Sequence, residues 1–244
     1  MAVLAARLMG QSWNLNSNQW QATTLIGFCL NAFYLGLFFV GLQWIDASLA
    51  TILASMLPLL VTVLERLIFK KRITYLGTLG LFLGCAGVIF IMGNRLSNEV
   101  DIWGVSSCVM GILALAIATL FVSEASSGGN VLMVVGLQML VGGFILAIAS
   151  IFLETWNINW TSALVMAFSY IIIVPGLVAT WVWFWLVKRI GPTGASTFRF
   201  LNPFFGIALA ALILDEAITS YDYLGVTIIS FGILAVQISR QKNL

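Results

Sequence analysis

Residues 68–77 read IFKKRITYLG, and residues 213–222 read ILDEAITSYD. In both stretches Ile-Thr follows a charged triplet, but the first triplet is Lys-Lys-Arg and the second is Asp-Glu-Ala. A shift of 145 residues, the separation of Pro58 from Pro203, superposes the two stretches and extends the match without a gap over residues 50–90. The matching positions in the first copy are Ala50, Pro58, Leu64, Leu67, Ile68, Ile73, Thr74, Leu79, Gly80 and Gly87. Matches at proline, threonine and glycine, besides leucine and alanine, indicate an internal repeat.

Around this repeat the chain is apolar: 61% of its 244 residues are hydrophobic and 8% are charged, whereas soluble domains average about 25% charged residues. A bilayer core needs roughly 20 apolar residues in a helix, and lipid-exposed backbone must satisfy its own hydrogen bonds. The runs are too long and too uniformly apolar for barrel strands, which alternate. The sequence therefore predicts an all-α polytopic membrane protein with about eight transmembrane helices, at 20–44, 47–69, 73–93, 101–122, 131–153, 162–187, 194–214 and 221–239.

Charged residues predict the orientation of these helices, because cytoplasmic loops favour lysine and arginine. An even number of spans puts both termini on one side, which then holds Arg7, Lys70, Lys71, Arg72, Lys188, Arg189, Arg240 and Lys242. The other side holds Arg95 and the acidic residues Asp46, Glu99, Asp101, Glu154, Asp215, Glu216 and Asp222. Both termini are therefore predicted to be cytoplasmic.

The reversed charge of the two triplets follows from the same topology. The 145-residue shift carries the second apolar run onto the seventh, and an odd step of five runs means that the two copies cross the membrane in opposite directions. The first triplet then lies inside, where cations are favoured, and its counterpart lies outside. Inverted-topology repeats of this kind are typical of secondary transporters.

Several classes of chemistry are not indicated. The absence of histidine argues against Ser-His triads and most zinc sites. Cys29, Cys85 and Cys108 each lie inside an apolar run, so we interpret them as small packing residues. No P-loop, intramembrane carboxylate pair or metal cluster is present in the sequence, and the net charge of +2 does not indicate a nucleic-acid partner. No cofactor and no enzymatic activity are predicted.

The segments 195–216 (ASTFRFLNPFFGIALAALILDE) and 217–236 (AITSYDYLGVTIISFGILAV) resemble the end of an EamA-type domain of the drug/metabolite transporter superfamily. Residues 47–91 resemble the same pattern, and FYLGLFFVGLQWIDAS and WVWFWLVKRIGPTGAS resemble the helix that precedes it in each copy. The resemblance implies two repeats, at 1–93 and 101–239. The family pattern has ten helices, and the helix at 20–44 resembles its third. The first helix and most of the second are therefore expected to be lacking. The first copy also has Lys70-Lys71 where the family often has Gly-Glu.

The resemblance further implies a function: movement of a small metabolite, amino acid or drug-like solute, often outward, by alternating access in a bacterial inner membrane. The expected partners are the lipid bilayer and a small-molecule substrate, with a homodimer or a helix-supplying partner as further possibilities. One rival interpretation is a truncated membrane protein or assembly partner that does not transport. A second rival, an intramembrane enzyme, is opposed by the missing histidine and the missing paired acids.

Polar and aromatic residues within the spans are candidates for the substrate pathway. Arg199 enters its span about 7–8 Å from the inner end, where a guanidinium could bind an anionic group or snorkel to the nearby surface. Asn31 and Tyr34 are interpreted as cavity residues or as part of a polar bridge between helices. Trp181 could stack on a ligand or belong to an interfacial belt with Trp183 and Trp185. The predicted pathway residues are Asn31, Tyr34, Ser55, Trp181, Arg199 and Asn202.

Proline and glycine spacing predicts two structural features of the bundle. Pro58, Pro175 and Pro203 are expected to kink their helices, because proline removes a backbone donor; helix packing alone is the other interpretation for Pro58 and Pro203. Glycines that alternate at spacings of three and four on one helix face allow a neighbouring backbone to approach closely. This second pattern comprises Gly77, Gly80, Gly84 and Gly87.

Overall fold

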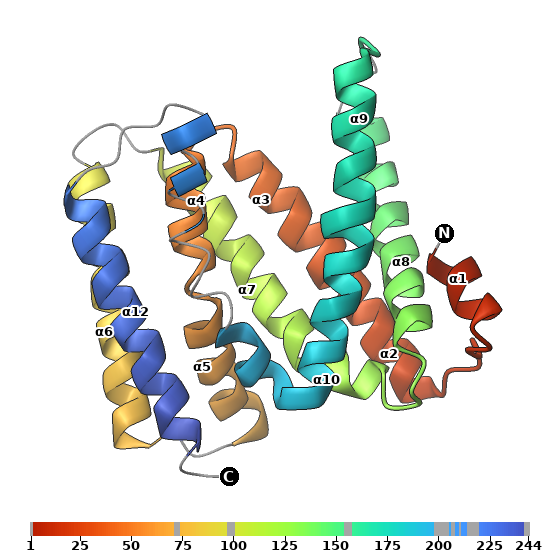
Figure 1. Ribbon diagram of the computed structural model, residues 1–244, viewed down its shortest axis with the longest axis horizontal. Helices are drawn as coiled ribbons and strands as arrows, with labels where there is room; N and C mark the ends of the chain where they lie inside the picture. Colours follow the sequence, from red (N-terminus) through yellow and green to blue (C-terminus); the bar gives the residue numbers. More distant parts are fainter. Residues whose placement is uncertain are drawn as a thin grey trace. The chain divides into compact units, whose positions relative to one another are not determined.

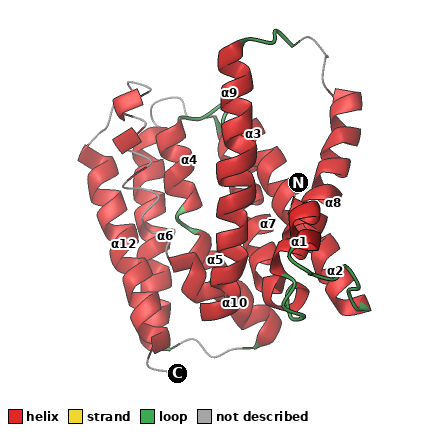
Figure 2. Cartoon of the chain, turned by 45° about the vertical axis from the view of Figure 1, so that its right-hand side comes forward, coloured by secondary structure: helices red, strands yellow, loops and turns green. Residues whose placement is uncertain are grey.

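The computed structural model is built from helices joined by short connections (Figure 1). It describes residues 2–70, 74–96, 101–153, 158–197, 205, 208–209, 211–213 and 220–241. Throughout these residues there are helices and loops and no strand (Figure 2), which confirms the predicted all-helical fold class. The helices are α1 (Ala2–Leu8), α2 (Ser17–Ile26), η1 (Gly27–Leu35), α3 (Gly36–Gly41), α4 (Ala47–Ala54), α5 (Leu57–Phe69), α6 (Tyr75–Leu96), α7 (Ile102–Ala125), α8 (Val131–Leu153), α9 (Ser162–Ile171), η2 (Ile172–Ala179), α10 (Thr180–Thr197) and α12 (Ser220–Gln241).

Within the described residues, five helical stretches are long and apolar enough to cross a membrane: Ser17–Gly41, Leu49–Phe69, Ile102–Ala125, Val131–Phe152 and Ser162–Pro192. Two shorter apolar stretches, Tyr75–Gly87 and Tyr223–Val236, lie within α6 and α12. These seven stretches correspond to seven of the eight predicted spans. The remaining span, predicted at 194–214, lies mostly outside the described residues.

The first long helix begins at Ser17 because Asn16 caps it. Asn16 Oδ1 accepts a hydrogen bond from the Gln19 N–H at 2.8 Å, and Gln19 Oε1 accepts one from the Asn16 N–H at 2.9 Å. This reciprocal capping box satisfies two of the donors that every helix N-terminus leaves unpaired. The helix therefore begins three residues before the predicted span. Gln19 also donates to Ser127 Oγ at 2.9 Å and so ties this end to the loop between α7 and α8.

Replacing Asn16 with alanine is expected to destabilise the fold by about 1 kcal/mol, because loss of an N-cap side chain typically has that effect. The measurement is the free energy of unfolding of the purified protein in a denaturing-detergent titration. Asn18→Ala is the matched control, since Asn18 is exposed within the first turn of α2 and does not cap it. Equal destabilisation by both variants would contradict a specific capping role for Asn16.

The predicted span at 47–69 is interrupted in the middle. Helix α4 ends at Ala54 and α5 begins at Leu57, with Pro58 in its first turn. Proline suits this position because the first-turn N–H groups have no intrahelical partner. Ser55 closes α4, and its hydroxyl donates to the Ile52 carbonyl at 2.5 Å. Pro58 therefore begins a second helical segment within the span.

Two stretches are wound as π-helix, with hydrogen bonds from residue i to residue i+5: η1 (Gly27–Leu35) and η2 (Ile172–Ala179). Pro175 lies inside η2. Both are long for this rare geometry, which occurs mostly as single turns and often at functional sites. Asn31 and Tyr34, three residues apart in η1, do not share a face as they would in an α-helix, because a π-helix holds more residues in each turn.

Element boundaries recur at the shift that aligns the sequence. Moved by 145 residues, the bounds of α2 fall on those of α9, and the bounds of α6 fall on those of α12. The start of η1 falls on the start of η2. The N-cap Asn16 falls on Thr161, whose side chain likewise accepts a hydrogen bond from the N–H three residues later. These helix ends, this N-cap and the start of the π-helical segment recur at 145 residues, whereas the division into repeats at 1–93 and 101–239 stays a prediction.

The chain forms two compact units, and each takes segments from both halves of the sequence. Unit 1 comprises Met1–Ala32 and Phe121–Ala195, and unit 2 comprises Phe33–Leu120 and Ser196–Leu244. In unit 1, α1 and α2 pack against α8, and the buried side chains include Ile26, Met133 and Phe184. In unit 2, buried side chains of α4, α5, α7 and α12 form the core, among them Leu49, Ile52, Leu57, Ile112, Leu115 and Ile229.

Helices α6 and α12 of unit 2 lie side by side along most of their lengths (Figure 1). They run antiparallel, since Thr74 Oγ1 donates to Ser239 Oγ near one end and Phe90 packs on Tyr221 near the other. A Cβ added to Gly80 would lie 2.4 Å from the Gly232 carbonyl, and one added to Gly87 would lie 3.0 Å from the Gly225 carbonyl. The close backbone approach predicted from the glycine spacing is confirmed for Gly80 and Gly87.

Candidate functional site

The structure describes four of the six predicted pathway residues. Asn31 lies in η1 of unit 1, Tyr34 in the part of η1 that belongs to unit 2, and Ser55 after α4. Trp181 lies in the first turn of α10. The other two, Arg199 and Asn202, lie outside the described residues, as does Pro203.

Asn31 is buried against α8, where it meets a residue that the sequence analysis did not single out. Its Nδ2 donates to the main-chain carbonyl of Gln138 at 3.3 Å and contacts the side-chain oxygen of the same residue. Gln138 is fully buried, and its Nε2 has no hydrogen-bond partner among the described residues. The arrangement is the interhelical polar bridge considered for Asn31, with one amide donor left over. The sequence did offer a signal for Gln138, since it is an amide side chain within the otherwise apolar run 131–153.

Two glycines bring η1 and α8 close enough for this pairing. A Cβ on Gly27 would lie 2.6 Å from the Gln138 carbonyl, and one on Gly142 would lie 2.3 Å from Cβ of Asn31. Both positions therefore require glycine, because the obstructing atoms belong to the backbone or to the first carbon of a side chain. Gln19 contacts Ser127 near the start of both helices, and Asn31 contacts Gln138 and Gly142 further along both. The two helices therefore run parallel. The contact between η1 and α8 is called the amide seam below.

Tyr34 makes different contacts from Asn31. Its ring packs on Phe38 of the same helix, with centroids 5.4 Å apart and planes tilted by 49°. A Cβ on Gly111 of α7 would lie 3.2 Å from the Tyr34 carbonyl, so the backbone of Tyr34 passes close to that helix. The structure therefore places Asn31 and Tyr34 in separate contacts, one in each unit.

Ser55 belongs to a buried polar row in unit 2 that continues along α5. Thr62 donates to the Pro58 carbonyl at 2.7 Å, and Glu65, one turn further, is 1% exposed. Both hydroxyls in this row are satisfied by carbonyl groups of nearby helical residues, so they leave little unmet hydrogen-bonding capacity.

Trp181 is 42% exposed, and Trp185 on the next turn is 45% exposed. The Arg189 guanidinium lies over the Trp185 ring, 5.2 Å from its centroid. Exposed tryptophans next to cations at a helix end are typical of a membrane interface. This geometry agrees with the aromatic-belt interpretation and leaves a ligand-stacking role for Trp181 as a prediction.

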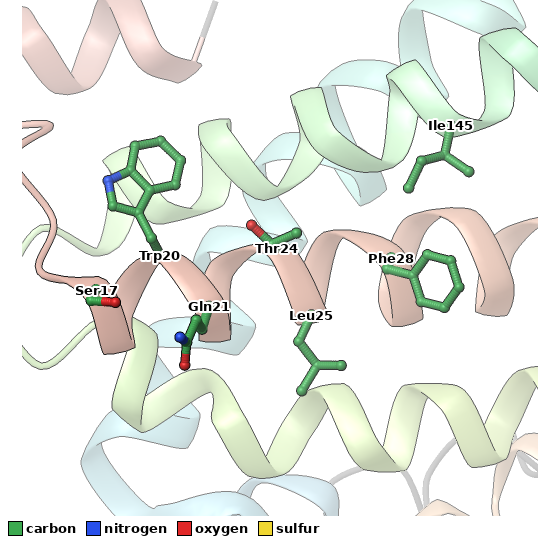
Figure 3. Close-up of a pocket in the computed structure, with 7 residues that line it drawn as sticks. All are labelled: Ser17, Trp20, Gln21, Thr24, Leu25, Phe28 and Ile145. Atoms are coloured by element: carbon green, nitrogen blue, oxygen red, sulfur yellow. The ribbon is translucent and has the colours of Figure 1, made fainter.

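A groove of about 580 Å³ lies in unit 1, along α2 and η1 (Figure 3). In Figure 3, Trp20, Thr24 and Phe28 lie on the side of the helix that faces Ile145 of α8. The wall is mainly apolar and aromatic, with a few hydroxyl and amide groups, a composition typical of small-molecule sites. Its seven lining residues are Ser17, Trp20, Gln21, Thr24, Leu25, Phe28 and Ile145.

The groove is lined mainly by α2, with one residue each from η1 and α8, the two helices that form the amide seam. Ile145 lies seven residues after Gln138 on α8, about 10 Å along the helix axis at 1.5 Å per residue. Phe28 lies three residues before Asn31 in η1. Across the described part of the chain, no group of three or more His, Cys, Asp or Glu side chains is arranged to hold a metal ion.

Comparison with known proteins assigns most of the chain to one family. The model described as "EamA-like transporter family" matches residues 1–93 and 102–238. A solved crystal structure is similar in fold, with a TM-score of 0.72 and 17% sequence identity. The superposed region comprises 98% of this chain and 84% of the chain in the crystal structure. At that identity the likeness shows the fold alone, and it agrees with the helical architecture described above.

Relatives of the chain are named as transporters. "Uncharacterized transporter sll0355" of Synechocystis is 25% identical over 83% of this chain and 66% of its own. "Uncharacterized transporter YoaV" of Bacillus subtilis is 25% identical over 86% of this chain and 73% of its own. "Uncharacterized inner membrane transporter YedA" of Escherichia coli K12 is 23% identical over 81% of this chain and 64% of its own. The chain thus spans about two thirds of the length of these relatives.

Proposed function

The chain belongs to the EamA-like transporter family, and from this premise we propose that it exports a small metabolite, amino acid or drug-like solute by alternating access. The family is a transporter family rather than an enzyme family, and the chain is a multi-pass membrane protein. The substrate class, the outward direction and the mechanism are the proposal.

The proposed mechanism rests on one observation: helix boundaries in the first half of the sequence recur 145 residues later in the second half. Helix starts, N-caps and π-helical segments repeat at the shift that also reverses the charge of the loop triplets. Two inverted halves of this kind can exchange conformations, so that a central site opens to one face and then to the other. This recurrence supports alternating access over a fixed channel.

The proposed pathway joins residues from both halves. Asn31 and Ser55 would offer polar groups within the bundle, Trp181 an aromatic face, and Tyr34 a phenol near the middle of its span. Arg199 would bind the anionic end of the solute, and Asn202 would lie beside the kink at Pro203. In the proposed orientation both termini face the cytoplasm, and the membrane is the bacterial inner membrane.

Flux into sealed vesicles tests this proposal. The purified full chain is reconstituted into liposomes, and efflux and uptake of a broad labelled panel of amino acids, polar metabolites and cationic drugs are compared with protein-free liposomes. The expected result is protein-dependent flux of at least one solute class that saturates with concentration. Equal flux with and without protein across the panel would favour the rival, a membrane protein that does not transport by itself.

A further inference from the structure

The amide seam contains a hydrogen-bond donor that the folded chain does not use. Gln138 is 0% exposed, and its Nε2 has no partner within the described residues, although its Oε1 contacts Asn31 Nδ2. Buried polar groups are nearly always paired in native structures, and each exception calls for an explanation such as a functional role or a bound water. Inside a membrane bundle the cost of an unpaired amide is not relieved by bulk water.

The surroundings of Gln138 hold this donor in place. Asn31 contacts its side-chain oxygen and also donates to its main-chain carbonyl, so the amide cannot rotate freely to exchange its nitrogen and oxygen. Gly27 and Gly142 remove the side chains that would otherwise separate the two helices. Asn31 itself lies in the π-helical segment η1, a geometry found frequently at functional sites.

A solute that bound here would have a defined chemistry. The free donor requires an acceptor oxygen, and the neighbouring groove offers the apolar and aromatic side chains of Trp20 and Leu25 on α2, Phe28 on η1 and Ile145 on α8. Among the described residues, the contacts of the amide seam include no lysine or arginine. A carboxylate placed here would keep its charge without a paired cation, which is unfavourable in a dry interior. A neutral carbonyl beside an apolar or aromatic body fits best.

We infer that Gln138, positioned by Asn31, is a substrate-binding residue that hydrogen-bonds a carbonyl-type oxygen of the transported solute through Nε2. This inference rests on the proposed transport function and specifies one contact of the substrate. Gln138 is then a determinant of specificity, because a solute that lacks the oxygen leaves the buried donor unpaired.

Calorimetric binding to the full chain in lipid nanodiscs tests the contact. The probes are benzamide, benzoate and benzylamine, which share one ring and offer a neutral carbonyl, a carboxylate and no oxygen. The variant is Gln138→Met, which keeps the length of the side chain and removes the donor. Gln43→Met is the matched control, since Gln43 is exposed in the turn after α3. The unfolding temperature is measured on the same samples.

The expected result is that the wild type and Gln43→Met bind benzamide at least tenfold more tightly than benzylamine, and that Gln138→Met loses this preference. Its unfolding temperature is expected to fall by only a few degrees, because the substitution removes the unpaired buried donor together with the side-chain acceptor of Asn31, which keeps the main-chain carbonyl of residue 138. A stronger, Gln138-dependent affinity for benzoate would assign the oxygen to a carboxylate.

Two outcomes would overturn the inference. One is binding by the wild type that does not depend on the carbonyl, or no binding of any probe. The other is unchanged benzamide binding in Gln138→Met, whatever its unfolding temperature, which would make Gln138 a structural amide. Saturable flux of other solutes in the vesicle assay would still support transport, so failure of this site and failure of the proposed function are distinguishable.

Discussion

Replacing Gly232 with leucine is expected to separate α6 from α12 and to destabilise the protein by about 3 kcal/mol or more, at the upper end of overpacking effects. A Cβ at Gly232 would lie 2.5 Å from the Gly84 backbone nitrogen and 2.7 Å from the Gly80 carbonyl oxygen. Both obstructing atoms are backbone, so no side-chain rotation relieves the clash. The measurement is the free energy of unfolding of the purified protein, supported by the yield of folded protein from membranes.

Gly143→Leu is the matched control for this prediction. Gly143 also lies within a membrane helix, α8, but a Cβ there would meet no atom within 4 Å. Its substitution is expected to change the free energy of unfolding by less than about 0.5 kcal/mol. If both leucine variants unfolded alike, the loss at Gly232 would reflect glycine content or helix hydrophobicity rather than the contact between α6 and α12.

Replacing Arg199 with alanine is expected to reduce the flux of an anionic or zwitterionic solute by roughly 10- to 100-fold. Hydrogen bonds to charged groups contribute about 1.5–3 kcal/mol, and about 1.4 kcal/mol corresponds to a factor of ten. The residue lies outside the described part of the chain, so the prediction rests on its place within a predicted span. The measurement is saturable flux in proteoliposomes, normalised to the amount of inserted protein.

Two further variants distinguish substrate binding by Arg199 from snorkelling of its side chain to the membrane surface. Arg66→Ala removes an exposed arginine in the last turn of α5 and is expected to leave flux unchanged. Arg199→Lys keeps the charge but loses the planar fork that matches a carboxylate, so an intermediate flux is expected. Full flux in Arg199→Ala would assign Arg199 to snorkelling at the inner surface and remove it from the substrate pathway.

Much of the fold could be predicted from local patterns. The apolar runs predicted the helices because each run must satisfy its own backbone in lipid, and seven of them correspond to described helical stretches. The glycine spacing predicted that another backbone approaches α6 closely, because a helix face of glycines has no side chains to keep a neighbouring helix away. The identity of that partner, α12, required the coordinates, since spacing on one helix says nothing about which helix meets it.

The candidate site was harder to anticipate. Asn31 was recognised because an amide in lipid needs a partner, but the partner, Gln138, lies 107 residues further along the chain. Pro58 marked the break after Ala54 in the sequence, but the π-helical winding of η1 left no clear mark there. Part of η1 approaches α8 closely at Gly27 and Asn31, a contact between segments that are distant in the sequence.

Residue order alone therefore determined the membrane environment, the number and approximate position of most helices, and the 145-residue repeat with its reversed loop charge. These follow from hydropathy and from charge, which act on each segment by itself. Tertiary structure decided which amide meets Asn31, which glycines face each other across α6 and α12, and which donor stays unpaired. Those outcomes depend on close packing between distant segments, where a single Cβ in the wrong place is enough to exclude the contact.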